Sequence, residues 1–359
     1  MMELKEVVTK LEKSKIKAGD GKKEGKYPLY TCSPTVDKFC DEYLYDTEAI
    51  ILSTGGNAVV NYYNGKFSYS TDCLVIQSDK NLKCKYMYYY LLSKIDIICK
   101  MFRGVGIKHL NKNEFFKLDI SIIDKEKQNK IISNLDIVNT IIELKRVQLK
   151  EYDNIIKSQF VEMFGDPVFN NLNWNELKMS ELGRLERGTS KHRPRNAPEL
   201  LGGIYPLIQT GDVSNSGLYI TEYKSTYSEL GLKQSKMWSK DTLCITIAAN
   251  IAQTSILTFD ACFPDSVVGF ITNGKVNNIF MHYWFEFLQK IIDSQATQVA
   301  QKNINLKILN DLDVIVPPIE LQNQFADFVK LIDKQKFEIE KSLKEMEELY
   351  DSLMEEYFG

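Results

Sequence analysis

The chain has 359 residues, of which 44% are hydrophobic and 26% are charged, and its formal net charge at pH 7 is −3. This composition supports ordinary hydrophobic cores and excludes a largely disordered protein, while the length predicts two or three domains. The apolar runs stay well below the roughly 18 residues of a membrane-spanning helix, and the first residues do not form a secretory signal, so we expect a cytoplasmic protein without membrane contact.

The cysteine and histidine patterns give no support for a bound metal or cofactor. The seven cysteines are odd in number and form no C-x-x-C pair, and the three histidines are scattered, so we expect free thiols, no metal and no cofactor.

The charge is unevenly distributed along the chain, because residues 336–359 contain three lysines and eight acidic residues. The rest of the chain is therefore slightly basic, and such local fields matter more for binding than the overall sum.

The first block, residues 1–123, has a mixed pattern. Short apolar runs at 49–52 and 73–76 are typical of buried strands. A tyrosine-rich stretch at 86–101 predicts a helix. This block therefore reads as an α+β domain.

Three further blocks follow in the order helix, mixed domain, helix. Their boundaries are 124–165, 166–318 and 319–359. Pro167 and Pro317 punctuate the joins, as expected where a helix ends or begins. We predict an α+β fold in which two mixed domains alternate with two long helices.

Both long helices carry a seven-residue apolar repeat in the same register, which is typical of a coiled coil. About forty residues at roughly 1.5 Å each would form a rod of roughly 60 Å. We expect the helices to pair as an antiparallel coiled coil; alternatively, each helix packs only on its own domain. The rows are Leu135, Ile142, Leu149, Ile156 and Met163 with Ile131, Val138, Lys145, Tyr152 and Gln159, then Phe325, Ile332, Ile339, Met346 and Leu353 with Val329, Lys336, Leu343, Tyr350 and Tyr357.

An internal repeat is the most informative feature of the sequence. Gln128 and its neighbour Asn129 recur as Gln322-Asn323, and Phe164-Gly165 recurs as Phe358-Gly359, both at an offset of 194 residues. The chain is thus two copies of a domain-plus-helix unit, which predicts a pseudo-twofold molecule. Looser matches are Tyr27-Pro28-Leu29 with Tyr205-Pro206-Leu207, Asp46-Thr47 with Asp241-Thr242, Lys108-His109-Leu110-Asn111 with Lys302-Asn303-Ile304-Asn305, and Leu118-Asp119-Ile120 with Leu312-Asp313-Val314.

Motifs for catalysis are missing from the sequence. There is no phosphate-binding G-x-x-x-x-G-K-[ST] loop and no Asn-Pro-Pro-Tyr-like motif of an adenine methyltransferase. Gly104-Val105-Gly106 is too short for a cofactor loop. Pro264-Asp265 begins like a metal-nuclease motif, but no acidic-x-Lys element follows it. We therefore expect the chain not to be an enzyme.

Two basic stretches occupy corresponding places in the two copies. Residues 13–26 are rich in lysine, and residues 184–195 are rich in arginine. Such stretches suit contacts to phosphates, which set affinity and orientation without reading sequence. Each stretch taken alone is more often a solvated loop. The candidate phosphate-contacting residues are Lys22, Lys23, Arg187, Lys191, Arg193 and Arg195.

Polar loops near expected strand ends could read base edges. Asparagine and glutamine can pair with adenine, and lysine with guanine, in the major groove. The same residue types also form ordinary turns, so the alternative for each loop is a turn. The candidates are Asn57, Gln209, Thr210, Asn250, Gln298, Gln301, Lys302 and Asn303. Lys108, which the repeat aligns with Lys302, is a further candidate contact to DNA.

The order of these motifs resembles the specificity subunit of a type I restriction-modification system over essentially the full length. The resemblance lies in the two divergent domains, the two repeated helices, the sequence Tyr-Pro-Leu-Ile-Gln-Thr-Gly-Asp-Val at 205–213, and Gln301-Lys302-Asn303-Ile304. A departure is the lysine-rich start of the first domain, which lacks the aromatic opening found at Trp174.

The resemblance implies two target recognition domains that each read one half of a bipartite double-stranded DNA site. It further implies that the helices space the domains and dock DNA adenine methyltransferase subunits, with a motor and restriction subunit joining for cleavage in phage defence. A separation of about one DNA turn, about 34–36 Å, fits within the expected rod. The alternatives are a nuclease or methyltransferase with a divergent site, and a coiled-coil scaffold that binds only proteins.

Overall fold

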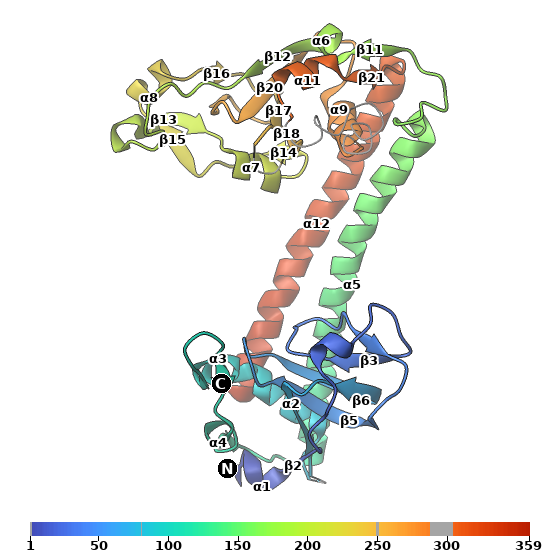
Figure 1. Cartoon of the computed structure of the whole chain (residues 1–359), viewed down its shortest axis with the longest axis vertical. Helices are drawn as coiled ribbons and strands as arrows, with labels where there is room; N and C mark the ends of the chain where they lie inside the picture. Colours follow the sequence, from blue (N-terminus) through green and yellow to red (C-terminus); the bar gives the residue numbers. More distant parts are fainter. Residues whose placement is uncertain (1, 80, 249–250, 288–303) are drawn as a thin grey trace. The chain divides into compact units, whose positions relative to one another are not determined.

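The computed structural model describes residues 2–79, 81–248, 251–287 and 304–359. The chain divides into two compact units (Figure 1). Unit 1 comprises Met1–Val147 with Glu340–Gly359, and unit 2 comprises Gln148–Ile339. Both units combine helices and strands, as the sequence predicts.

Unit 1 is built on a six-stranded sheet with the order β2-β7-β5-β6-β3-β4. The central strands alternate sides, so Ile50 and Leu52 face one core and Ala49 and Ile51 face another. The strands are β2 (Val8–Lys10), β3 (Tyr27–Tyr30), β4 (Phe39–Cys40), β5 (Tyr45–Ser53), β6 (Val60–Tyr69) and β7 (Cys73–Ser78).

Short helices and small ribbons cover this sheet. The helix α2 (Cys84–Ser93) packs on it through buried tyrosines and Met87, and a break at Lys94 separates it from α3 (Ile95–Lys100). The predicted single helix over 86–101 is therefore two helices. The remaining elements are β1 (Met2–Glu3), α1 (Leu4–Val7), η1 (Ala18–Asp20), β8 (Phe102–Arg103), β9 (His109–Leu110), α4 (Lys112–Phe115) and β10 (Asp119–Ile120).

Unit 2 has a five-stranded sheet with the order β12-β20-β17-β18-β14 and a four-stranded sheet with the order β15-β13-β19-β16. A separate two-stranded ribbon joins β11 to β21. The strands are β11 (Glu176–Lys178), β12 (Gly183–Arg187), β13 (Leu201–Leu207), β14 (Tyr219–Ile220), β15 (Ser225–Tyr227), β16 (Met237–Trp238), β17 (Leu243–Thr246), β18 (Thr254–Leu257), β19 (Ala261–Cys262), β20 (Val267–Thr272) and β21 (Asp313–Ile315).

The short helices of unit 2 fill the space around its sheets. The apolar helix α9 (Asn278–Phe285) lies in the largest core, where Phe280 and Trp284 are fully buried. The others are α6 (Met179–Leu182), η2 (Pro198–Leu200), α7 (Thr210–Asn215), α8 (Glu229–Lys233) and α11 (Leu306–Asp311).

The two long helices are α5 (Lys125–Phe164) and α12 (Ile319–Phe358), and each has 40 residues. Every residue of the predicted heptad rows is buried or half-buried. In unit 1, the Asn134 amide donates to the Tyr357 hydroxyl at 2.8 Å. In unit 2, the Lys336 ammonium lies 2.7 Å from the Asp153 carboxylate. Among the described residues, no helix is long and apolar enough to cross a membrane.

The repeat is visible in the hydrogen bonds that fix each long helix to its domain. The fully buried Gln128 side chain accepts from Lys83 N–H at 2.8 Å and donates to the carbonyls of Asn81 and Ile123. The fully buried Gln322 side chain makes the same three bonds to residues offset by 194. Its partners are Asn277 N–H at 2.8 Å and the carbonyls of Lys275 and Pro317.

Strand register refines the sequence alignment of the two units. The strand β20 follows β7 at the offset of 194, because Asp79 N–H and Asn273 N–H make equivalent bonds to the carbonyls of Val7 and Leu182. Ile50 pairs with Ile76 and Leu243 pairs with Phe270, so β17 follows β5 at an offset of 193. The predicted match of Asp46-Thr47 with Asp241-Thr242 is therefore wrong by two residues. The match of Tyr27-Pro28-Leu29 with Tyr205-Pro206-Leu207 is confirmed, because Leu29 and Leu207 both pair in parallel with residues related by 194.

Candidate nucleic-acid interface

Each unit has one edge of its main sheet where several loops meet, which we call the loop edge. In unit 1 it lies where β5 ends and β7 begins, and Thr54 N–H donates to the Asp72 carbonyl at 2.8 Å. In unit 2 the equivalent bond joins Ile247 N–H to the Ser266 carbonyl at 3.0 Å. Most of the described residues predicted to contact DNA lie at these two edges.

The loop edge of unit 1 brings together Asn57 and Lys108, which are far apart in sequence. The loop after β5 bonds to the hairpin of β8 and β9, since Gly56 N–H donates to the Lys108 carbonyl at 2.9 Å. Leu110 N–H in turn donates to the Thr54 carbonyl at 3.1 Å. The side chains of Asn57 and Lys108 are both exposed, so each is available to a ligand.

Lys22 and Lys23 lie beside β3 and β4. The backbone of Lys22 bridges to Phe39, and its ammonium forms an ion pair with Asp41. This pairing raises the pKa of Lys22, first through the hydrogen bond and second through the charge of Asp41. Lys23 is exposed. Of these two predicted phosphate contacts, Lys22 already has a partner of opposite charge.

The basic segment of unit 2 divides into free and paired cations. Arg193 and Arg195 both face Asp265, with nitrogen–oxygen distances of 3.7 and 2.5 Å. Asp265 is thus an ion-pair partner of both arginines, and it belongs to the Pro264-Asp265 pair that only begins like a metal-nuclease motif. Arg187 and Lys191 are exposed and have no ion pair within the described part of the chain. These two side chains are the better candidates for phosphate contacts.

Gln209 and Thr210 begin the helix α7 instead of forming a loop. Gln209 precedes the helix and its N–H donates to the Asp212 carboxylate at 2.8 Å. The Gln209 and Thr210 side chains line a pocket of about 210 Å³ together with Arg195 and Ser266. The pocket therefore unites three predicted DNA-contacting residues with the loop edge of unit 2.

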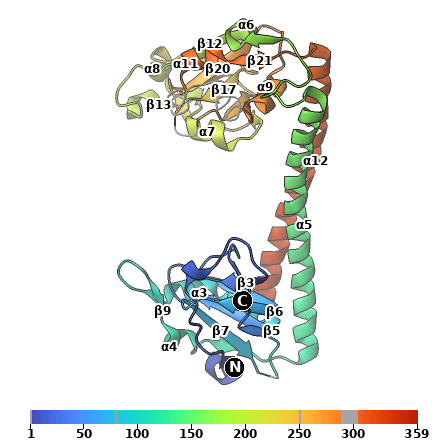
Figure 2. The same ribbon diagram turned by 45° about the vertical axis from the view of Figure 1, so that its right-hand side comes forward.

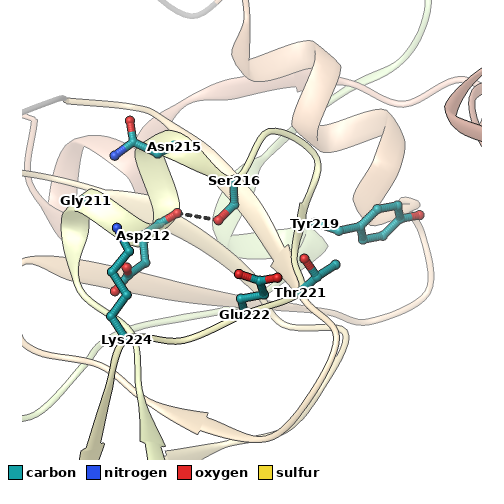
Figure 3. Close-up of a pocket in the computed structure, with 8 residues that line it drawn as sticks. All are labelled: Gly211, Asp212, Asn215, Ser216, Tyr219, Thr221, Glu222 and Lys224. Carbon is teal, nitrogen blue, oxygen red and sulfur yellow. Dashed lines mark hydrogen bonds between the residues drawn. The ribbon is translucent and has the colours of Figure 1, made fainter. Parts of the chain in front are cut away.

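A second pocket, of about 330 Å³, opens on the other side of α7 (Figure 3). The Ser216 hydroxyl donates to the Asp212 carbonyl at 2.6 Å. The charged residues that line this pocket are Asp212, Glu222 and Lys224, so carboxylates outnumber cations. Such a lining repels phosphate groups, so we assign no contact to a nucleic-acid backbone to this pocket.

Five predicted residues lie outside the described residues: Asn250, Gln298, Gln301, Lys302 and Asn303. Their equivalents in unit 1 include Lys108, which lies at the loop edge. The sequence did not single out the exposed side chains of Val105 and Ile107 on the adjoining hairpin. The only signal for them is a pair of apolar residues among glycines.

The described residues contain no metal-binding cluster, and several of their buried histidine and cysteine side chains have shifted pKa values. No group of three or more histidine, cysteine, aspartate or glutamate side chains in the described ranges could hold a metal. The His282 ring nitrogen lies 2.9 Å from the Thr254 hydroxyl, and desolvation of the ring lowers the pKa of His282 to about 4. Burial likewise raises the pKa of the Cys73 and Cys84 thiols to about 12, so neither is an active nucleophile at neutral pH.

The family model for the type I restriction modification DNA specificity domain matches residues 1–152 and 171–348. The chain is 23% identical to the type I restriction enzyme EcoDI specificity subunit of Escherichia coli, over 95% of this chain and 83% of that protein. The crystal structure of a type I restriction-modification S subunit from M. genitalium has the same fold, with a TM-score of 0.64, 15% identity, and coverage of 100% of this chain and 95% of that one.

A solved structure described as showing complex assembly and conformational transition of the type I R-M system also matches. Its TM-score is 0.57 at 14% identity, with 99% of this chain and 96% of that chain covered. Two full-length structural matches of this kind support one shared arrangement of elements along the chain.

Proposed function

Because this chain belongs to the family of type I restriction-modification DNA specificity subunits, we propose that its two units each read one half of a bipartite double-stranded DNA target. The chain is a non-catalytic recognition subunit. The observation that carries the bipartite target is the duplicated loop edge, since Thr54–Asp72 and Ile247–Ser266 are equivalent bonds in the two units. Two equivalent surfaces on diverged sequences suit two different half-sites.

We further propose that α5 and α12 form an antiparallel coiled coil that sets the spacing between half-sites. The side chains of the heptad rows are buried or half-buried on both helices. The pairing is antiparallel, because the residue numbers rise along α5 as they fall along α12. Asn134 contacts Tyr357, and Arg146 contacts Glu347 at 2.7 Å. Two domains that each discriminate by about 1–3 kcal/mol per base pair gain specificity when a rigid spacer couples them.

The helices also carry apolar side chains for partner subunits. Ile137 and Leu331 are 56% and 57% exposed and are related by the 194-residue repeat. Ile155 and Leu349, 44% and 42% exposed, are related in the same way. Equivalent exposed apolar positions on both helices fit two copies of one partner, which we propose to be DNA adenine methyltransferase subunits, with a motor and restriction subunit joining for phage defence.

The domain limits remain those suggested by the sequence. We propose target recognition domains at 1–123 and 166–318, and conserved helical regions at 124–165 and 319–359. DNA modification takes place where the chromosome lies, so we assign the complex to the cytoplasm.

The test of this function is sequencing of adenine methylation in cells with and without the gene. We expect a divided adenine-containing motif to be methylated only when the gene is present, because the recognition subunit directs the methyltransferase. Deleting the methyltransferase gene should remove the same motif. A methylation pattern that is unchanged by loss of this gene would contradict the proposal.

A second prediction concerns the free cations of unit 2. Replacing Arg187 or Lys191 by alanine, each in its own variant, should weaken DNA binding by the assembled complex about equally for every sequence. The dependence of log affinity on log salt should become less steep, by about 0.9 in slope for each phosphate that the protein no longer neutralises. Fluorescence anisotropy at several salt concentrations measures both quantities.

Two variants serve as controls for that experiment. Lys275 is exposed beyond the opposite end of β20, so Lys275→Ala should leave the slope unchanged. Arg195→Ala should have a smaller effect than Arg187→Ala, because Arg195 is already paired with Asp265. Equal slopes for all four variants and the unmodified complex would refute the assignment.

A further inference from the structure

The hairpin of β8 and β9 has an exposed apolar tip. Val105 is fully exposed and Ile107 is 70% exposed, although they are only two residues apart. Figure 2 shows this loop extending away from the rest of unit 1 beside the label β9. Single exposed apolar residues are common, but two on one narrow loop form a surface that suits a ligand with apolar features.

The base of the hairpin is fixed while its tip is free. Phe102 pairs with Leu110 and Arg103 with His109, and the Gly56–Lys108 bond holds the hairpin to the neighbouring loop. In contrast, Gly104 and Gly106 flank Val105 with φ values of +141° and +87°. These left-handed conformations favour glycine and let the chain turn tightly without packing behind the tip.

Exposed lysines lie on the hairpin and directly after it. Lys108 and Lys112 are exposed and form no ion pair in the part of unit 1 that the structure describes. Arg103 is balanced by Glu114 at 2.7 Å. Cations beside an apolar tip complement a ligand with phosphates outside and methyl groups inside. Duplex DNA has that arrangement, because thymine presents its methyl group in the major groove.

The dimensions favour the major groove. The strands of an antiparallel ribbon lie about 4.7–4.9 Å apart, and the major groove, about 12 Å wide, admits such a ribbon. The minor groove is only about 6 Å wide. A side chain that separates stacked bases needs firm support, and a tip between two glycines lacks it.

We propose that the β8–β9 hairpin enters the major groove of the half-site read by unit 1, and that Val105 and Ile107 contact thymine methyl groups there. This inference rests on the proposed DNA-recognition function. It assigns to the two side chains a role in specificity, while Lys108 contacts the DNA backbone.

The test uses the full chain assembled with its methyltransferase subunits and duplexes of the target found by methylation sequencing. Each thymine is replaced in turn by uracil, which lacks only the methyl group. We expect about a fourfold loss of affinity at one or two positions in a single half-site, as for one buried methyl group. The Val105→Ala and Ile107→Ala complexes should be insensitive to uracil at those positions.

Leu44→Ala is the matched control, because Leu44 is 44% exposed beside the opposite end of β5. It should retain the full uracil sensitivity. If the unmodified complex binds its target but uracil has no effect, or if Val105→Ala keeps the same sensitivity, the inference fails and the proposed function stands. A rise in 2-aminopurine fluorescence on binding that Val105→Ala abolishes would mean base unstacking and also overturn it. Failure to bind the target at all would overturn the proposed function itself.

Discussion

Replacing Gln128 by leucine should destabilise unit 1 by about 3 kcal/mol or more, because each buried polar group left without a partner costs about 1–3 kcal/mol. Three backbone groups lose their partner: Lys83 N–H and the carbonyls of Asn81 and Ile123. Leucine fills much of the space but offers no hydrogen bond. Thermal unfolding of the purified chain should show an early transition, shifted by about 6–12 °C for a unit of this size.

The matching change in unit 2 is Gln322→Leu, which removes the equivalent three bonds. Hydrogen exchange should localise each effect, with faster exchange near Lys83 in the first variant and near Asn277 in the second. Gln324→Leu is the control, since Gln324 is exposed on the same helix. Equal stability of Gln322→Leu and Gln324→Leu would contradict the assigned role.

The substitution Gln128→Glu separates hydrogen bonding from packing. The introduced side chain could still accept from Lys83 N–H, but an ionised carboxylate cannot donate to the two carbonyls. Burial would raise the pKa of the introduced carboxyl above its unfolded value, so the folded state would bind the proton more readily. The free energy of unfolding of Gln128→Glu should be lower than that of the unmodified chain, and this deficit should shrink as pH falls from 7 towards 5. A deficit that grows in this range would contradict the bonding scheme.

The sequence predicted the long helices and their buried rows because apolar spacing is recorded directly in residue types. It did not identify the hydrogen-bond partners of the two buried glutamines of the repeat. Gln128 and Gln322 were recognised, yet their partners Asn81 and Lys275, or Lys83 and Asn277, share no side-chain chemistry. These partners use backbone groups, which any residue supplies, so sequence comparison cannot detect them.

The strand alignment failed for a related reason. An apolar strand such as β5 has no residue that marks its register, and a shift of two residues preserves which face each side chain occupies. The Tyr-Pro-Leu motif succeeded because proline restricts where a strand can pair. Likewise, the sequence could locate the basic stretches, but only the folded chain distinguishes Arg187, which is free, from Arg195, which faces Asp265.

Removing one heptad from each long helix should shorten the spacer of the recognised DNA while leaving the bases of both half-sites unchanged. The natural cut takes residues 143–149 and 343–349, which lie opposite each other where Arg146 meets Glu347. Seven residues at about 1.5 Å each remove about 10 Å. That length corresponds to about three base pairs at about 3.4 Å each. Methylation sequencing of cells carrying the variant would report the new spacer.

The DNA helix makes this test demanding. Three base pairs also rotate one half-site by about a third of a turn, since a turn takes about 10–10.5 base pairs. A coiled coil shortened by one heptad keeps its own register, so the units cannot follow that rotation fully. We therefore expect weaker methylation at the shortened spacing, not a return to the original one.

Deleting residues 143–149 from α5 alone is the control. The two helices would then differ in length by seven residues, so the side chains that pair at Asn134–Tyr357 and at Asp153–Lys336 could not both meet. Methylation should be lost entirely. If the double deletion instead changed the recognised bases at an unchanged spacing, the helices would not be the ruler, and the units themselves would determine the distance between half-sites.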